Sequence, residues 1–317
     1  MKYYVGIDGG GTKTKVVIID ENENLVFENT SGPSSIDTVD NNTTLASFNQ
    51  ALEPFFKKNR NVSFQAVFIG VGGIVSEQDC KQVEIFSRHI IGVSEHTLMR
   101  ARNDMENALY SGLLFDEGIA LICGTGMVAF GKNKEGSTHK AGGWGYREGD
   151  LGSSYDLGMR SLRHVIKAFD GRDTMSAFST AVAKEIGMSS TEDFFHIIND
   201  KYLDRTWIAS LAPLVTAYSL KNDINAKHIV DHATDELALA VYAVAKKLNI
   251  KDSSLVIIGS LGHAKGYQEV LHTKINHLLP NIHIIHPKVD PAYEAPYKTT
   301  LSIIDGLTSN VKNKCHL

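Results

Sequence analysis

The architecture of this chain can be read outward from residues 3–20, YYVGIDGGGTKTKVVIID. Apolar residues up to Ile7 and the β-branched run Val16–Ile19 predict two strands. Between them, Asp8 ends the first strand and is followed by three glycines, Gly9, Gly10 and Gly11. Glycines let a ligand approach the backbone closely, and successive N–H groups in such a turn can cradle phosphate oxygens. The hairpin therefore predicts a phosphate loop, with a ligand-free glycine turn as the alternative.

Two better-known phosphate loops do not fit this hairpin. The dinucleotide fingerprint needs a third glycine where this chain has Thr14, and it opens a helix rather than a β-branched strand. The Walker pattern needs a glycine directly before Lys13-Thr14, where Thr12 stands instead. Thr12 and Lys13 extend the cradle of the hairpin, and Asp8 is placed to hold a metal ion or its waters.

Bulk composition limits the class of protein. At 317 residues the chain is long enough for two domains, and 43% hydrophobic with 21% charged residues is typical of a soluble globular protein. A net charge of −4 and a pI near 6.3 argue against non-specific nucleic-acid binding, which needs a basic surface. No apolar run approaches the roughly 18 residues of a membrane span, and no signal peptide is recognisable. We expect a cytoplasmic protein without a nucleic-acid or membrane partner.

Cysteine and histidine spacing gives little sign of a metal centre. Cys80, Cys123 and Cys315 lie far apart without a C-x-x-C pair. This excludes a disulfide framework and the usual zinc and iron–sulfur motifs, and it fits a reducing compartment. His228 and His232 have the i, i+4 spacing of a metal pair on a helix, but no third ligand is evident. A solvated helix face is expected there.

The opening hairpin recurs in the second half of the chain. Gly118–Cys123 predicts a strand, Gly124-Thr125-Gly126 a glycine turn, and Met127–Gly131 a second strand. Two copies of one hairpin indicate two related domains facing one ligand, which we place at residues 1–115 and 116–317. A last helix, expected at 292–307, would pack back on the first domain. Alternating strands and helices predict an α/β fold with a mixed sheet and helices on its faces.

Three further features point to a ligand. Residues 141–154, AGGWGYREGDLGSS, set five glycines around Trp144, which structure alone does not readily explain. Leu255–Ile258 predicts a buried strand that meets a loop, Gly259–Gly262, opening a helix. Asp104 follows a strand expected near 97–101 and precedes a helix, so it should point into the crevice where open α/β sheets bind ligands. A helix N-cap is the alternative for this aspartate.

In these motifs the chain resembles the actin-like ATPase superfamily and, within it, the BadF/BadG/BcrA/BcrD-type ATPase and N-acetylglucosamine kinase family. The residues that carry the resemblance are Val5–Thr14 (first phosphate motif), Cys123–Gly126 (second phosphate motif), Gly142–Gly145 with the glycines after it, and Ile257–Ser260 (adenosine motif). The resemblance implies two actin-like (ribonuclease H-like) domains, each with a mixed five-stranded sheet and flanking helices. It also implies ATP and Mg²⁺ as cofactors.

The resemblance assigns roles to individual residues. Asp104 is implied as general base toward the 6-hydroxyl of a sugar, and Asp8 as the Mg²⁺ residue, acting through water. The ATP-binding residues that it implies are Gly9, Gly10, Gly11, Thr12, Lys13, Gly124, Thr125, Gly126, Gly259, Ser260 and Leu261. The sugar-binding residues that it implies are Ser34, Ser35, Gly72, Asn103, Asp104, Gly142, Gly143, Trp144, Gly145 and Asp150.

Several of these residues have plainer alternatives. Asp8 would otherwise be a turn aspartate at a strand end, and Lys13 a solvated hairpin lysine. Trp144 would otherwise pack in a core, and Asp150 would cap the following helix. The chain also departs from the family at Leu151, where glutamate is usual, and at Ser35, where the family often has asparagine. Both departures lie near the expected sugar.

The resemblance implies an ATP-dependent kinase for the 6-hydroxyl of an N-acetylated amino sugar, N-acetylglucosamine, N-acetylmuramic acid or both, in amino-sugar or cell-wall salvage. The chain is most similar to the bacterial kinases that act on both sugars. A glucosamine kinase, an ATP-driven activator of a 2-hydroxyacyl-CoA dehydratase-type enzyme and a non-enzymatic sensor are the alternatives. The resemblance implies that such an activator would be a dimer that holds an iron–sulfur cluster through cysteines. Cys80, Cys123 and Cys315 do not supply that arrangement. A homodimer is compatible with the family.

Overall fold

The computed structural model describes residues 2–11, 13–22, 24–112, 117–201 and 204–287. The described chain forms two compact units, one within residues 2–112 and the other within 117–286. The boundary expected at 115/116 lies outside the described residues. The helix expected at 292–307, Cys315 and Thr12 lie outside the described residues. Each unit is described by itself below.

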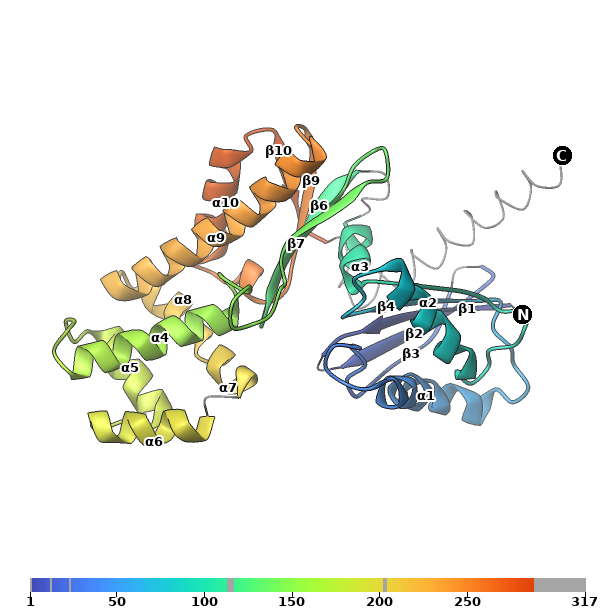
Figure 1. Ribbon diagram of the computed structural model, residues 1–317, viewed down its shortest axis with the longest axis horizontal. Coiled ribbons are helices and arrows are strands. Elements are labelled where there is room, and N and C mark those ends of the chain that lie inside the picture. Colours follow the sequence, from blue (N-terminus) through green and yellow to red (C-terminus); the bar gives the residue numbers. More distant parts are fainter. Residues whose placement is uncertain (1, 12, 23, 113–116, 202–203, 288–317) are drawn as a thin grey trace. The chain divides into compact units, whose positions relative to one another are not determined.

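The first unit is built on a five-stranded mixed sheet of order β3-β2-β1-β4-β5 (Figure 1). Its strands are β1 (Tyr3–Gly9), β2 (Thr14–Asp20), β3 (Leu25–Ser31), β4 (Ala66–Val71) and β5 (Leu98–Arg102). The β1–β2 and β2–β3 pairs are antiparallel, whereas β1, β4 and β5 run parallel. The helices are α1 (Asn41–Lys58), α2 (Glu77–Phe86) and α3 (Asp104–Ser111), with a 3₁₀ turn, η1 (Ser87–His89).

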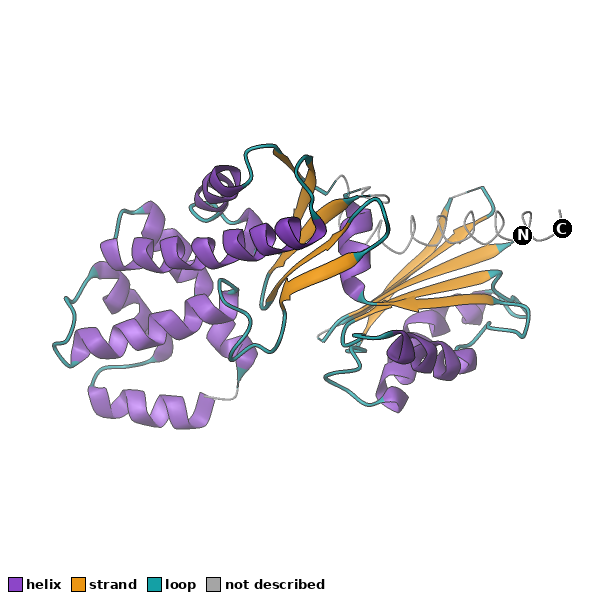
Figure 2. Ribbon diagram, turned by 45° about the horizontal axis from the view of Figure 1, so that its top comes forward, coloured by secondary structure: helices purple, strands orange, loops and turns teal. Residues whose placement is uncertain are grey.

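The second unit has a sheet of order β10-β9-β6-β7-β8 (Figure 2). Its strands are β6 (Gly118–Cys123), β7 (Met127–Lys132), β8 (Thr138–Gly142), β9 (Ser253–Ile258) and β10 (Ile282–Ile285). Between β8 and β9 come α4 (Ser154–Phe169), α5 (Ala177–Ile186), α6 (Thr191–Lys201), α7 (Arg205–Ala209), α8 (Ala212–Leu220) and α9 (Ile224–Leu248). The turn η2 (Leu261–His263) and α10 (Gln268–Leu278) follow β9.

Both sheets have the same topology. Read from β8, the second sheet repeats the first: an antiparallel meander of three strands, then two parallel strands added beside its first strand. The predicted α/β fold with a mixed five-stranded sheet in each half is confirmed. The sequence pattern did not predict β8, because its residues, Thr-His-Lys-Ala-Gly, are half-buried or exposed at the sheet edge and carry no apolar alternation.

Helix α9 shows how the apolar pattern builds the second core. Its residues Val230, Ala233, Leu237, Val241 and Val244 recur at three- and four-residue steps and are all buried. The helix packs against the sheet on this face, and α8 and α10 pack beside it. Asp223 caps the N-terminus, and Asn249 ends the helix in the left-handed conformation, at φ 56°. Among the described residues, no helix is long and apolar enough to cross a membrane.

Candidate functional site

The first part of the site lies at the carboxyl ends of three parallel strands of the first unit. Asp8 is near the end of β1, Gly72 follows β4, and Asp104 follows β5. A Cβ atom on Gly72 would lie 2.4 Å from Ser35 Oγ and 3.4 Å from Asp104 Oδ2. The sheet therefore brings Ser35, Gly72 and Asp104, which are far apart in the sequence, to one place.

The phosphate hairpin closes through its backbone. Gly10 N–H donates to the Lys13 carbonyl at 3.0 Å. Gly9 is needed sterically, because a Cβ there would lie 2.3 Å from Ser34 Oγ. At Gly10 and Gly11 a Cβ would meet no described residue beyond its chain neighbours closer than 3.5 Å, so packing within the described chain does not explain these glycines. The space beside them is open to a ligand, and Lys13 is exposed next to it.

The two serines of the expected sugar loop differ in position. Ser34 is buried, and its hydroxyl accepts a hydrogen bond from Thr14 Oγ1 at 2.6 Å. Its N–H donates to the Gly10 carbonyl at 3.0 Å. Ser34 thus ties its loop to the hairpin, whereas Ser35 lies beside Gly72 and hydrogen-bonds Asp37.

Asn103 rather than Asp104 caps α3. Its Oδ1 accepts from Met105 N–H at 2.8 Å, and its Nδ2 donates to the Ile74 carbonyl at 2.6 Å. The side chain of Asn103 is therefore engaged within the unit. Asp104 occupies the first helical turn. Burial, and after it the nearby carboxylates of Asp8 and Asp37, raise the pKa of Asp104 to about 7.

The carboxylates of Asp8 and Asp104 fit a nearby divalent cation. Each is close enough to the other for the charge of Asp8 to raise the pKa of Asp104, and a cation would relieve that repulsion. Mg²⁺ keeps several waters and takes one or two carboxylates. The described residues contain no group of three or more His, Cys, Asp or Glu side chains arranged for a metal. This also gives no support to a zinc site at His228 and His232.

In the second unit, the second phosphate turn and the adenosine motif form one backbone surface. Parallel pairing of β6 with β9 sets Ile122 opposite Ile258. Gly259, at φ 95°, comes so close that a Cβ would lie 2.3 Å from the Cys123 carbonyl oxygen and 3.1 Å from Gly124 N. Thr125 and Ser260 are exposed at this surface.

Leu261 and Gly124 differ in what each makes available to a nucleotide. Leu261 is 4% exposed and packs in the core of the second unit, so only its backbone is available to a nucleotide. At Gly124 no described residue other than its chain neighbours lies within 4 Å of the position of a Cβ, which leaves this side open within the described chain.

Sequence reasoning missed Arg205, which belongs to this surface. Its Nη2 donates to Asp150 Oδ2 at 3.0 Å. A Cβ on Gly126 would lie 2.5 Å from both of these atoms. The Nε of Arg205 is buried and has no hydrogen-bond partner among the residues that the structure describes. An arginine in the long helical segment carries no local signal, because only tertiary folding brings α7 to the turn.

The carboxylate of Asp150 accepts hydrogen bonds from two groups of the protein, Arg205 and the Met127 N–H. It is 6% exposed, and burial raises its pKa while Arg205 opposes the rise. Met127 N–H also donates to its carboxylate. Ser153, not Asp150, caps α4. The cap alternative for Asp150 is therefore wrong, and its carboxylate lies at the phosphate turn.

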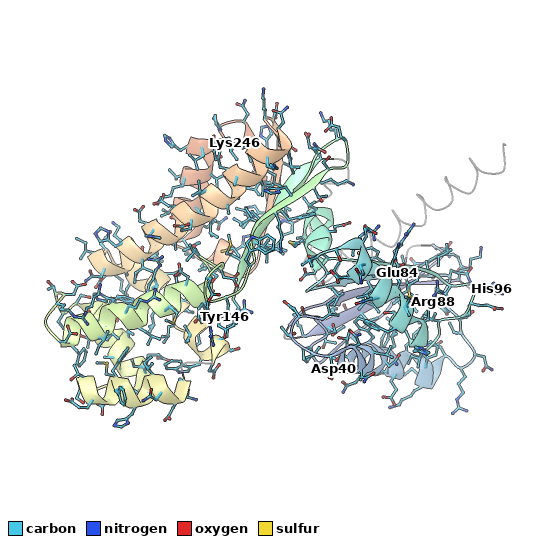
Figure 3. The ribbon with its side chains drawn as sticks, viewed as in Figure 1. Asp40, Glu84, Arg88, His96, Tyr146 and Lys246 are labelled. Atoms are coloured by element: carbon cyan, nitrogen blue, oxygen red, sulfur yellow. The ribbon has the colours of Figure 1, made fainter. Side chains whose placement is uncertain are left out.

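Trp144 is exposed in a tight glycine loop. The side chain of Trp144 is 68% exposed, and Lys140 Nζ lies 3.8 Å from the ring centroid. Core packing as the alternative for this residue is wrong. Tyr146, on the same loop (Figure 3), packs edge-on against Tyr155 at 5.0 Å and lies 5.2 Å from the Arg205 guanidinium. The loop thus connects an exposed aromatic face to the phosphate turn.

We expect Arg205→Ala to lower the free energy of unfolding, because the buried Asp150 carboxylate would lose its partner. Hydrogen bonds to charged groups contribute about 1.5–3 kcal/mol, and the lower end applies because the Arg205 side chain is 38% exposed. Urea unfolding of Arg205→Ala, Asp150→Asn and the double variant would measure the coupling. Asp150→Asn should recover most of the loss, and equal losses in the single Arg205 and double variants would contradict the pairing.

Comparison with known proteins identifies the family of this chain. The chain matches the family described as the BadF/BadG/BcrA/BcrD ATPase family over residues 5–295. It is 30% identical over 304 residues to the N-acetylmuramic acid/N-acetylglucosamine kinase of Clostridium acetobutylicum, with 93% of this chain and 97% of the relative covered. It is also 30% identical over 310 residues to the N-acetyl-D-glucosamine kinase of Dictyostelium discoideum, covering 92% and 96% of the two chains.

Solved structures show the same fold. A Chromobacterium violaceum protein proposed to be an N-acetylglucosamine kinase matches with a TM-score of 0.76 at 22% identity, over 95% of this chain and 99% of that one. A ROK family glucokinase from Streptomyces griseus matches with a TM-score of 0.58 at 11% identity, over 93% and 97%. The match along residues 5–295 and the two kinase relatives establish that this chain belongs to the BadF/BadG/BcrA/BcrD ATPase family.

Proposed function

We propose that this protein is an ATP-dependent kinase that phosphorylates the 6-hydroxyl of an N-acetylated amino sugar, N-acetylglucosamine, N-acetylmuramic acid or both. The observation that carries the proposal is Asp104, a carboxylate with a pKa raised to about 7, beside the open phosphate hairpin. The kinase relatives support the choice of substrate class. A role in amino-sugar or cell-wall salvage in the cytoplasm is part of the proposal.

Phosphoryl transfer needs positioning, charge neutralisation and a group that takes the hydroxyl proton. Asp104 takes that proton, since a base with a pKa near the working pH is effective. The N–H groups of Gly10 and Gly124 already donate within their turns, to the carbonyls of Lys13 and Gly126. The remaining backbone N–H groups of Gly9–Gly11 and Gly124–Gly126 hold the β- and γ-phosphates, with Lys13 beside the first turn. Arg205 adds a cation at the second turn. Bound near Asp8 through water, Mg²⁺ would neutralise charge on the phosphates.

The sugar contacts are proposed on both units. On the first, Ser35 and Gly72 lie beside Asp104, and the sugar hydroxyl must come within reach of the same carboxylate. On the second, the loop of Gly142, Gly143 and Gly145 presents the exposed face of Trp144, which suits an apolar sugar surface.

We expect Trp144→Ala to raise KM for the sugar without changing KM for ATP, as measured by steady-state kinetics. A rise in KM for ATP alone would contradict a sugar role.

Substrate-dependent ATP turnover tests the proposal. Purified protein with Mg²⁺ and ATP would be assayed with N-acetylglucosamine, N-acetylmuramic acid, glucosamine and glucose, and the position of the new phosphate would be determined by NMR. We expect turnover with the N-acetylated sugars, a 6-phosphate product and slow hydrolysis without sugar. Preference for glucosamine would favour the glucosamine kinase reading, to which a 26% identical Vibrio cholerae relative named glucosamine kinase also points. Sugar-independent ATP hydrolysis would contradict the kinase.

The dehydratase-activator alternative makes a different demand, an iron–sulfur cluster held by exposed thiolates. Cys80 and Cys123 are both buried, and burial raises the pKa of each thiol. Neither is therefore suited to bind a cluster at a surface. Iron analysis of the purified protein separates the two functions, because the kinase is expected to be free of iron and colourless.

The pH dependence of the reaction should follow the protonation state of the Asp104 carboxylate. The base form is needed, so kcat/KM for the sugar is expected to rise with pH and then level off. The midpoint should lie at or below about 7, the pKa of Asp104 without a bound cation. Asp37→Asn removes a carboxylate that raises the pKa of Asp104, so the rise should move to lower pH. Rates would be measured from pH 5.5 to 9 with Asp252→Asn, an exposed aspartate of the second unit, as control. An Asp37→Asn profile that coincides with the control would contradict this assignment.

A further inference from the structure

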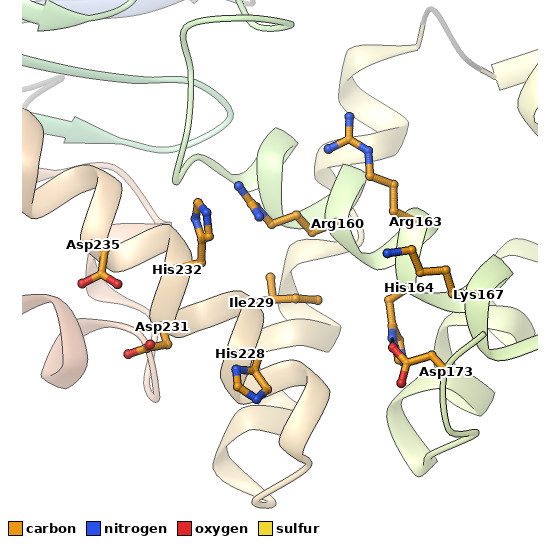
Figure 4. A pocket seen from close by; sticks show the side chains of 10 residues that line it. All are labelled: Arg160, Arg163, His164, Lys167, Asp173, His228, Ile229, Asp231, His232 and Asp235. Carbon is orange, nitrogen blue, oxygen red and sulfur yellow. Dashed lines mark hydrogen bonds and ion pairs between the residues drawn. The ribbon is translucent and has the colours of Figure 1, made fainter. Parts of the chain in front are cut away.

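A cavity lies within the second unit, and its lining includes no residue of the second phosphate turn or of the Trp144 loop. Its volume is about 480 Å³, and it opens between α4 and α9 (Figure 4). That volume is within the range of about 300–1,000 Å³ typical of small-molecule sites. The residues that line it are Arg160, Arg163, His164, Lys167, Asp173, His228, Ile229, Asp231, His232 and Asp235.

One wall of this cavity is cationic. Arg160, Arg163 and Lys167 follow one another at three- and four-residue steps, which places them on one face of α4. Across the cavity, His228 and His232 lie one turn apart on α9. In Figure 4 the guanidinium of Arg160 extends toward His232, and the ammonium of Lys167 points into the space between the helices.

The carboxylates that line the cavity are already paired. Asp231 and Asp235 both receive Lys274 Nζ, at 2.6 and 2.7 Å. Asp173 contacts His164 Nδ1 at 3.1 Å, and the other ring nitrogen of His164 contacts Ser179 Oγ at 2.8 Å.

Other side chains of the cavity lack such partners. Among the described residues, the side chains of Arg163, His228 and His232 make no hydrogen bond or ion pair, and the charge of Lys167 acts on Asp170, whose pKa it helps to lower. The guanidinium of Arg163 and the ammonium of Lys167 therefore remain available to an anion in the cavity.

We infer that this cavity binds a small phosphorylated metabolite. A phosphate monoester carries close to two negative charges and three acceptor oxygens, which match Arg163, Lys167 and the two histidines. The cavity has room for a body of sugar size beside the phosphate. Inorganic phosphate shares the charged part of this chemistry and lacks the body. The inference does not depend on the kinase activity proposed above.

The cavity is linked to the second phosphate turn through α4. Arg160 Nε donates to Asp156 Oδ2 at 2.9 Å, and the same oxygen accepts Gly152 N–H at 3.0 Å. Ser154, the first residue of α4, donates its N–H to the Gly124 carbonyl at 2.8 Å. An anion that draws Arg160 into the cavity would weaken its hold on Asp156. Occupancy is therefore expected to change the mobility of the segment that supports the nucleotide turn.

Titration calorimetry of the full chain tests the inference, with inorganic phosphate and glucose 6-phosphate as probes. We expect glucose 6-phosphate to bind more tightly than phosphate. Arg163→Ala/Lys167→Ala should weaken both by about tenfold or more, because charge-assisted hydrogen bonds are lost. His228→Gln/His232→Gln should weaken them by a smaller factor. Lys247→Ala/Lys251→Ala removes the same charge from exposed positions outside the cavity and is the matched control.

Two further measurements locate the bound anion. Lys13→Ala should leave the affinity unchanged, which separates the cavity from the phosphate hairpin. Added glucose 6-phosphate should alter amide hydrogen exchange over residues 150–155 in the wild-type protein but not in Arg163→Ala/Lys167→Ala. The inference is overturned if neither probe binds, if the double alanine variant binds as well as the control, or if Lys13→Ala abolishes binding.

Discussion

Asp104→Asn is expected to lower the rate of sugar phosphorylation by about 10²–10⁴-fold while ATP affinity stays close to that of the wild type. Asparagine has nearly the same shape but takes no proton from the sugar hydroxyl. The cap of α3 is kept, because Asn103 and not Asp104 provides it. Turnover with saturating N-acetylglucosamine, together with calorimetric titration of a non-hydrolysable ATP analogue, would separate chemistry from binding.

Stability provides an internal control for this variant. The folded-state pKa of Asp104 is about 7, above its ordinary value of 3.8, so the ionised group opposes folding increasingly as the pH rises between these values. Asp104→Asn removes that charge and should be at least as stable as the wild type at pH 8 in urea unfolding. Loss of activity with retained stability would exclude misfolding as its cause. Turnover near the wild-type rate would remove Asp104 from the mechanism.

Gly259→Ala is expected to be the most damaging small substitution in the second unit. A Cβ would sit 2.3 Å from the Cys123 carbonyl oxygen, a backbone atom of β6 that has little freedom to move. The residue would also be held at φ 95°, which costs roughly 1–3 kcal/mol for a residue other than glycine. The strand end must shift, and Gly124 of the phosphate turn shifts with it.

Gly136→Ala separates the two costs. Gly136 has a similar φ, 80°, but no atom of the described residues other than its chain neighbours lies within 4 Å of its Cβ position. It should therefore lose only the conformational part, with unchanged nucleotide affinity. Urea unfolding and titration of the ATP analogue would be compared for both variants. If Gly259→Ala lost no more stability or affinity than Gly136→Ala, close packing of the two turns would not matter for nucleotide binding.

Much of the fold could be predicted from local pattern. Both hairpins, the strands at 66–71 and 118–123 and the apolar stripe of α9 follow from β-branched runs, glycine turns and helical periodicity. Repetition of the hairpin predicted the duplicated sheet topology that the structure shows. Local pattern failed at β8, whose side chains are not buried enough to alternate.

Local pattern also failed wherever a role depends on a partner distant in the chain. The pairing of Arg205 with Asp150 joins residues 55 positions apart. That of Thr14 with Ser34 joins residues 20 apart. No periodicity or motif marks these pairs, because hydrogen bonds between side chains depend on packing of whole elements rather than on neighbouring residues. The cavity between α4 and α9 also could not be predicted from local pattern, because its lining comes from helices that are distant in the chain.

The sequence by itself therefore determined the family, the two mixed sheets and the glycine turns offered to phosphate, since backbone conformation and strand burial are encoded locally. Only the tertiary structure decided which side chains lie near these turns and how buried each of them is. In the folded structure Asn103 caps α3, and Asp104 has its pKa raised by burial and by nearby carboxylates. The tertiary structure also exposed Trp144 and set Arg205 at Gly126. These outcomes depend on distance and burial between segments remote in the chain, and both arise only when the elements pack.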